Sequence, residues 1–160
     1  MIVVADSSAL IALARIGRLE LLHETADVVH IPEAVFEEVV QKGVGRPGSA
    51  ELAQADWLRR RTVRDVASVD RLRARLGRGE SEAIVLAKEL GADFVVIDDA
   101  AARRVAEAGG QPVVGLPGWL IYLKQREIIG AVKPLLDEML ASGFYLDEQH
   151  YQSILHRAAE

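Results

Sequence analysis

The sequence contains no cysteine and few aromatic residues, and each absence removes a class of site. Without cysteine, neither a disulfide framework nor a thiolate metal site is possible. Aromatic residues make up only 5% of the chain, and Trp57, Trp119 and Tyr122 are too dispersed to predict a base-stacking platform. The four histidines lack the spacing of a helical two-histidine metal site. The glycines at 77 and 79 match neither common phosphate-loop motif.

Long apolar runs are also absent. No run approaches the ~18 residues that a membrane-spanning helix needs, and residues 1–17 carry Asp6 early without a basic leader, which argues against a signal peptide. Apolar residues make up 50% of 160 residues, enough for the core of one domain. We expect a single domain over 1–160, with 119–160 as its helical C-terminal extension, and a cytoplasmic protein.

Positive charge is scarce overall but concentrated in one segment. The net charge is -5, yet the segment 57–78 carries eight arginines against two aspartates, a local charge of +6 that leaves -11 for the rest. Such asymmetry can steer a polyanion to one side of an acidic protein. The alternative is a solvated helical face. If the segment binds RNA, the candidate contacts are Arg59, Arg60, Arg61 and Arg73.

Short apolar segments alternate with helical patterns along the chain. Strands are expected at 2–5, 28–31, 93–97 and 112–115, with a further one possible at 57–63. Helices are expected between them, and their predicted starts follow Ser7–Ser8, Pro32, Ser68, Gly79, Asp99 and Leu116. This alternation predicts an α/β fold, a three-layer α/β/α arrangement with a central, mainly parallel sheet.

Acidic residues fall where such a sheet would bind a ligand, beyond the carboxyl ends of its strands. Asp6 follows the first strand, and Asp98 and Asp99 follow the strand at 93–97. The helix after Pro32 and the helix after Gly79 add further acids, namely Glu37, Glu38, Glu80 and Glu82. Each has an ordinary explanation by itself, because aspartate is a good helix N-cap and the helix dipole favours an acid in the first turn.

Several carboxylates within a few ångströms raise one another's pKa and destabilise the fold unless something offsets their repulsion. A hard cation such as Mg²⁺ or Mn²⁺ does so with oxygen ligands. Such a centre is suited to phosphodiester hydrolysis, because the metal polarises the phosphoryl oxygen and lowers the pKa of a bound water.

Four segments occur in an order that resembles the PIN-domain family. They are ADSSALI (5–11), IPEAVFEEV (31–39), GRGESEAIVLAKELGADFVVIDDAAARRVA (77–106) and VVGLPGWL (113–120). The sequence looks most similar to a small prokaryotic, VapC-like branch of toxin-like and nucleic-acid-binding proteins. The resemblance implies an α/β/α fold and a metal-dependent ribonuclease, in many members the toxin half of a toxin–antitoxin pair.

The resemblance also implies roles for individual residues. It assigns the catalytic acids to Asp6, to Glu38 rather than Glu37, to Glu80, and to Asp98 or Asp99. Of these, the metal ligands would be Asp6, Glu80, Asp98 and Asp99, with the Ser7 hydroxyl supporting Asp6. Apart from the resemblance, Arg103 and Arg104 follow on the helix after Asp99, and one of them is expected either to bind phosphate or pair with a site carboxylate, or to be a plain surface arginine. The sequence departs from the common pattern at Glu80, where most family toxins carry aspartate, and at Ile97, where many carry threonine.

The sequence therefore predicts a Mg²⁺- or Mn²⁺-dependent endoribonuclease that binds RNA, and a toxin neutralised by a small antitoxin protein. The early helices, with Leu10 and Leu13, form either a homodimer face or part of the core. One rival is a catalytically weak or inactive module of the same fold that binds nucleic acid or protein. Another is a phosphatase or phosphotransfer domain, which favours a second acid two residues after Asp6, where Ser8 stands.

Overall fold

Five short parallel strands form the central sheet of this computed structural model, which describes residues 1–160. The strand order is β3-β2-β1-β4-β5, and every neighbouring pair is parallel. The strands are β1 (Val3–Ala5), β2 (Val29–Pro32), β3 (Leu58–Arg61), β4 (Phe94–Val96) and β5 (Val113–Val114). The possible strand at 57–63 is thus real and lies at one edge of the sheet.

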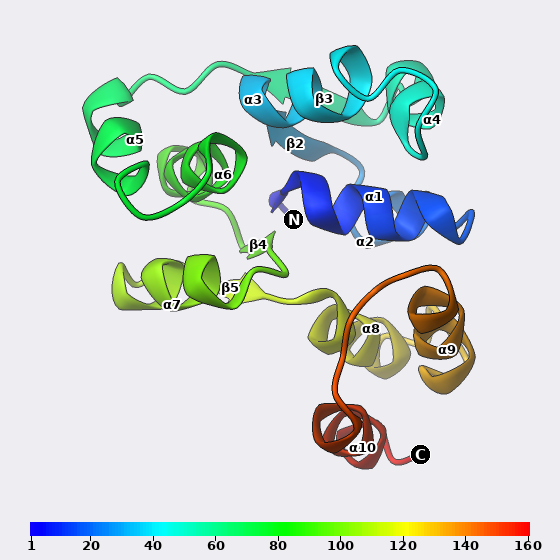
Figure 1. Ribbon diagram of the computed structural model, residues 1–160. Coiled ribbons are helices and arrows are strands. Elements are labelled where there is room, and N and C mark those ends of the chain that lie inside the picture. The colour runs from blue at the N-terminus through cyan, green and yellow to red at the C-terminus, as the bar shows by residue number, and fades with distance from the viewer.

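Helices cover both faces of this sheet, so the predicted α/β/α architecture is confirmed (Figure 1). One face is covered by α5 (Val66–Leu72), α6 (Arg78–Leu90) and α7 (Ala100–Ala108). The other is covered by α1 (Ser7–Arg15), α2 (Leu21–Thr25), α4 (Ser49–Gln54), α8 (Leu116–Gln125), α9 (Lys133–Ala141) and α10 (Glu148–Arg157). Helix α3 (Glu33–Phe36) and the π-helical segment η1 (Glu37–Gln41) follow β2. No helix has both the length and the apolar character that a membrane crossing requires.

The strand side chains alternate between two apolar cores. Val3 and Ala5 of β1 belong to the core beneath α1 and α8, while Val4 belongs to the core beneath α6. Because both sides of the central strands are buried, their sequences are continuous apolar runs without polar alternation. Leu136 of α9 and Leu155 of α10 belong to the same core as β1. The C-terminal helices therefore pack on the sheet through a core shared with the N-terminal strand.

The chain changes direction around β1, and this opens a crevice in the sheet edge. From β1 it proceeds to β2 and β3 on one side, then returns to β4 on the other side of β1. Connections leave β1 and β4 in opposite directions, so the carboxyl ends of these two adjacent strands lie at a topological switch point. Asp6 N–H donates to the Val96 carbonyl at 3.2 Å, which keeps the two strand ends side by side.

Two helix starts differ from the sequence prediction. Helix α5 begins after Asp65, not after Ser68, because the Asp65 carboxylate accepts hydrogen bonds from both the N–H (3.0 Å) and the hydroxyl (2.6 Å) of Ser68. Helix α6 begins before Gly79 and not after it, with Gly77 as N-cap and Gly79 in the first turn. Glycine is tolerated at an N-cap, and the carboxylate of Glu38 occupies the space beside Gly79 that a side chain would need.

The helix expected from Glu33 to Gln41 also changes character halfway. Lys42 N–H donates to the Glu37 carbonyl at 2.8 Å, an i→i+5 bond that makes the second half π-helical. Short π-helical segments inside helices commonly occur at functional sites. This segment carries Glu37 and Glu38, two of the acids identified in the sequence.

If the C-terminal helices belong to the domain core, Leu136→Ala should destabilise the whole chain. Leu136 is fully buried, and leucine-to-alanine changes at such positions cost about 2–5 kcal/mol. Urea unfolding followed by tryptophan fluorescence and circular dichroism should shift as one transition. Val44→Ala is the control, because Val44 is 76% exposed. Separate transitions by the two probes would show that residues 116–160 fold apart from the sheet.

Candidate functional site

Asp6 connects β1 to α1 and keeps one carboxylate oxygen without a partner. Its Oδ1 accepts a hydrogen bond from Ala9 N–H at 3.0 Å and so caps the helix. Its Oδ2 is buried and has no hydrogen-bond partner, and the residue is only 1% exposed. A plain N-cap would face solvent with its second oxygen, so the buried Oδ2 indicates more than capping.

Asp98 has the same arrangement at the end of β4. Its Oδ1 accepts from Leu116 N–H at 2.7 Å, at the N-terminus of α8. Its Oδ2 is buried and partnerless, like that of Asp6. Two adjacent strands thus each deliver a carboxylate with one oxygen fixed by a backbone N–H and the other unsatisfied. Buried polar atoms without partners are rare, and a pair at a switch point indicates a ligand site.

The structure separates Asp98 from its neighbour. Asp99 is exposed and caps α7, with its Oδ1 accepting from Ala102 N–H at 2.8 Å. It therefore has the ordinary structural role expected of an N-cap aspartate. The sequence left open which of the two acids faces the site, and the geometry favours Asp98.

The neighbouring glutamates of η1 also have different surroundings. Glu38 Oε2 accepts a hydrogen bond from the Ser7 hydroxyl at 2.6 Å. Ser7 is the residue that directly follows Asp6 in the sequence. Its carboxylate lies against Gly79, where an added Cβ would be 2.9 Å from Oε1. Glu37 instead pairs with Arg78 at 2.6 Å. Ser7 therefore supports Glu38, whereas the resemblance had implied that its hydroxyl supports Asp6.

Arg78 connects η1 to α6 through two carboxylates. Besides Glu37, it contacts the buried Glu82 at 2.7 Å, and Glu82 in turn accepts from Ala34 N–H at 3.4 Å. Glu82 is thus held by an arginine and a backbone N–H, as a buried charge requires. This network fixes η1, and with it Glu38, against the start of α6.

Glu80 completes the group of acids from the first turn of α6. Its carboxylate lies against Gly77, where a Cβ would be 2.5 Å from Oε2. Gly77 and Gly79 therefore leave room for two glutamate carboxylates. This explains the glycines around Arg78, for which the sequence suggested only a helix break.

Burial and mutual repulsion change the acidity of the two aspartates. The pKa of Asp6 is raised to about 8, with burial as the largest cause; the Ala9 N–H opposes the rise, and the negative charges of Asp98, Glu80 and Glu38 add to it. Burial likewise raises the pKa of Asp98 to about 6, against the Leu116 N–H and the Arg103 charge. Without a cation, Asp6 is therefore largely protonated at neutral pH, and its free oxygen Oδ2 is the one available to carry the proton.

The donor set fits a hard divalent cation, because it consists of carboxylate oxygens and two of these are buried without partners. As they stand, no three acidic or histidine side chains are close enough together to enclose an ion. Like charges without a cation between them repel, and Glu38 is held by Ser7. Binding an ion therefore requires the glutamates to move toward the aspartates.

Arg103 supports the strand end from which Asp98 projects. Its Nη1 donates to the backbone carbonyls of Ile97 at 3.2 Å and Asp98 at 2.5 Å. It also lies beside Gly115, where a Cβ would be 3.1 Å from Nη1. The sequence predicted a phosphate or carboxylate contact for Arg103. The structure places it on main-chain oxygens, where it orients the end of β4.

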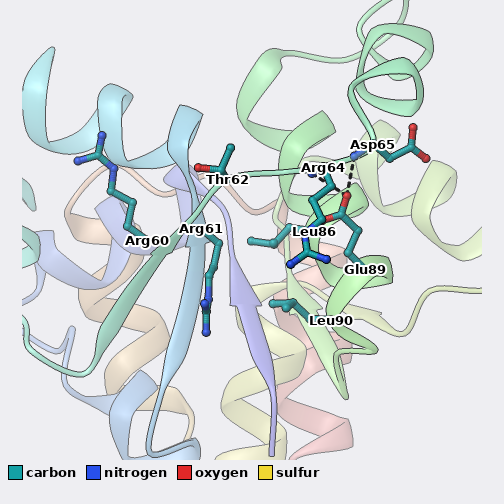
Figure 2. A pocket seen from close by; sticks show the side chains of 8 residues that line it. All are labelled: Arg60, Arg61, Thr62, Arg64, Asp65, Leu86, Glu89 and Leu90. Atoms are coloured by element: carbon teal, nitrogen blue, oxygen red, sulfur yellow. Dashed lines mark hydrogen bonds between the residues drawn. The ribbon is translucent and has the colours of Figure 1, made fainter.

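The other predicted RNA contacts lie away from the acids. Arg59, Arg60 and Arg61 are on the edge strand β3, with β2 and β1 between them and β4. Figure 2 shows Arg60 and Arg61 pointing to opposite sides of β3, and Arg61 with Arg64 lines an open cleft of about 850 Å³.

Two of these β3 arginines already have partners within the chain. Arg60 pairs with Glu33 at 2.5 Å and lies over the Phe36 ring, while Arg61 donates to His30 Nδ1 at 3.2 Å. Arg73 is exposed at the C-terminal end of α5. Basic charge at an exposed strand edge also prevents edge-to-edge pairing, so this cluster has a structural explanation as well.

Two features near the acids were missed in the sequence. Phe144 and Tyr145, in the loop between α9 and α10, line cavities that also reach Asp98. In the sequence, the two adjacent aromatic residues directly after Gly143 were the signal that could have identified this loop.

Leu10 and Leu13 were candidates for a homodimer face. Both are fully buried within the chain, so a homodimer face on α1 cannot consist of them.

A family model described as a PIN domain matches residues 2–160. The matched span includes all four segments on which the resemblance rests, and it extends through α8, α9 and α10. No curated protein matches the sequence at a significant level.

Asp6→Asn should stabilise the metal-free protein, and more at high pH than at low pH. Because the folded-state pKa of about 8 lies above the ordinary 3.8, ionisation of Asp6 opposes folding, and this penalty grows as the pH rises between those values. Asparagine keeps the helix cap without the charge. In EDTA, we expect the melting temperature to rise by at least about 2–4 °C at the upper end of this range, corresponding to ~1 kcal/mol.

Asp65→Asn is the matched control, since Asp65 is an exposed N-cap aspartate on α5. If the melting temperature of Asp6→Asn is at or below that of the wild type across the whole pH range, ionisation of Asp6 does not destabilise the folded protein.

Proposed function

Because the chain belongs to the PIN-domain family, whose members are generally nucleases that use divalent metals, we propose that it is a metal-dependent endoribonuclease. The observation that carries the proposal is the pair of buried, partnerless oxygens, Asp6 Oδ2 and Asp98 Oδ2, at the switch point of the sheet. A ligand able to satisfy both oxygens at once must be positive or a strong donor, and a hard cation is both.

Mg²⁺ or Mn²⁺ would be held by Asp6 and Asp98, with Glu80 and Glu38 on the α6 and η1 side. Bound there, the ion supplies phosphoryl polarisation and an activated water. The protein contributes the orientation of its ligands. Ala9 N–H and Leu116 N–H each fix one oxygen of an aspartate and leave the other directed into the site.

The remaining residues prepare the site for charge. Ser7 holds Glu38 within reach of Asp6, and Arg103 fixes the main chain at Asp98. The proton on Asp6 has to leave when a cation binds, so binding releases a proton and tightens as the pH rises. Burial of Asp6 keeps bulk water away from this carboxylate and strengthens its attraction to the ion.

The proposal has four narrower parts: RNA as the substrate, a role as a toxin, a small antitoxin protein as partner, and a homodimer. They rest on the family resemblance, and the acidic net charge of -5 gives no separate support for nucleic-acid binding. A module of the same fold that binds without cleaving is the alternative. Glu80 and Ile97, which depart from the common family pattern, favour it, and the cleavage test below separates the two.

We expect the purified protein to cleave single-stranded RNA when Mn²⁺ is added. Asp6→Asn and Asp98→Asn should each lower the rate by about 100-fold or more, because even residues that only support a metal ligand contribute 10- to 100-fold. Asp99→Asn should stay within about 3-fold of the wild type, since Asp99 caps α7 outside the site. Gel separation of an end-labelled RNA gives the rates.

Equal cleavage by the wild type, Asp6→Asn and Asp98→Asn would identify a contaminating nuclease and refute the proposal. RNA binding without cleavage by any of them would support the non-catalytic module. A larger loss in Asp99→Asn than in Asp98→Asn would reverse the assignment of the pair.

Mn²⁺ should also raise the melting temperature of the wild type, independently of any reaction. A ligand at 100 times its dissociation constant stabilises by about 2.7 kcal/mol, or roughly 5–10 °C for a chain of this size. Asp98→Asn should lose most of this shift, whereas the exposed N-cap variant Asp65→Asn should keep it. The same shift in Asp98→Asn and the wild type would place the ion elsewhere.

A further inference from the structure

The loop between α9 and α10, which Figure 1 shows beside α8, lines two cavities, and both cavities reach Asp98. The first, here the α1 groove, has a volume of about 300 Å³ and runs along α1 from Ser8 to Arg15. The second, here the α10 groove, has a volume of about 410 Å³ and extends past Gly115 to Arg157 on α10. The two grooves diverge from one carboxylate of the proposed catalytic site.

The aromatic pair of this loop is divided between core and solvent. Phe144 is half-buried and packs on the main apolar core, which anchors the loop. Tyr145 is 84% exposed, makes no hydrogen bond, and lines both grooves. No hydrogen bond or burial accounts for Tyr145, and it is shared by the linings of the two grooves.

Each groove is lined by an exposed arginine, Arg15 in the α1 groove and Arg157 in the α10 groove, and the α10 groove is also lined by Arg103 and Glu107. Arg15 and Arg157 are exposed and take part in no ion pair, in contrast to Arg60 and Arg78. Arg15 lies seven residues along α1 from Ser8, roughly 10 Å at the rise of an α-helix. The grooves therefore combine a carboxylate centre, an exposed aromatic ring and a free cation on each side.

We propose that these grooves bind the two flanks of a single-stranded RNA, with Tyr145 stacking on a base and Arg15 and Arg157 contacting phosphates. This rests on the proposed function and deepens it by assigning the path of the RNA strand across the surface and the residues that contact its flanks. Stacking on Tyr145 requires an unpaired base, because the faces of paired bases are covered by their neighbours. The unpaired arginines match a polyanion, and they lie on the same side of the sheet as Asp98.

The test measures the binding of a short fluorescent oligouridylate by anisotropy in EDTA, so that no cleavage occurs. Tyr145→Ala should weaken binding by about 5- to 100-fold, the contribution of one stacked base, while Tyr145→Trp should retain or tighten it. Arg15→Ala and Arg157→Ala should each reduce the salt dependence of log K by about 0.7. Arg126→Ala is the control, because Arg126 is an exposed arginine at the end of α8 outside both grooves.

If Tyr145→Ala, Arg15→Ala and Arg157→Ala all bind the oligouridylate with the affinity of the wild type, the inference is overturned. The grooves would then be candidates for contact with a protein partner instead. A fully paired duplex that binds as tightly as the single strand would also overturn it. If binding depends on Tyr145 but no variant or wild type cleaves RNA, the RNA path stands and the nuclease proposal fails. If the wild type cleaves and Tyr145→Ala binds and cleaves equally well, the nuclease proposal stands without this path.

Discussion

The site depends on two buried carboxylates that the sheet brings together at its switch point. Asp6 and Asp98 leave adjacent parallel strands, and each gives one oxygen to a helix N-terminus, α1 and α8 respectively. Their second oxygens are buried and unsatisfied. Burial raises the pKa of both groups, and repulsion from the surrounding acids adds to the rise for Asp6. Folding without a cation therefore costs stability, which the proposed ion would restore.

The surrounding structure keeps the glutamates near this pair without forcing them onto it. Arg78 ties η1 to α6 through Glu37 and Glu82, while Gly77 and Gly79 leave space for Glu80 and Glu38. Arg78 neutralises Glu37 and Glu82, so these two acids do not add to the repulsion around Asp6 and Asp98. The acidic cluster therefore does not disrupt the fold. Glu38 is held by Ser7, so the proposed ion would have to draw its side chain away from that hydrogen bond.

Much of the fold follows from local patterns. The continuous apolar run at 93–97 predicted β4, and the helical spacing of apolar residues after Gly79 predicted α6. The start of α5 was wrong because Asp65 competes with Ser68 as a cap. The π-helical turn at 37–41 was missed, since no local propensity distinguishes an i→i+5 bond from an i→i+4 bond.

The sequence by itself determined the chemistry available to this protein: oxygen ligands without thiolates, acids after two strands, and the likeness to PIN domains that a match over residues 2–160 confirms. Only the tertiary structure distinguishes Asp98 from Asp99, a choice that the sequence left open, and shows the different surroundings of Glu37 and Glu38. Asp98 and Asp99, like Glu37 and Glu38, are adjacent in sequence and chemically equivalent there. Their directions are set by distant groups, the Leu116 N–H, Arg78 and Ser7, and contacts over such separations exist only once the chain has folded.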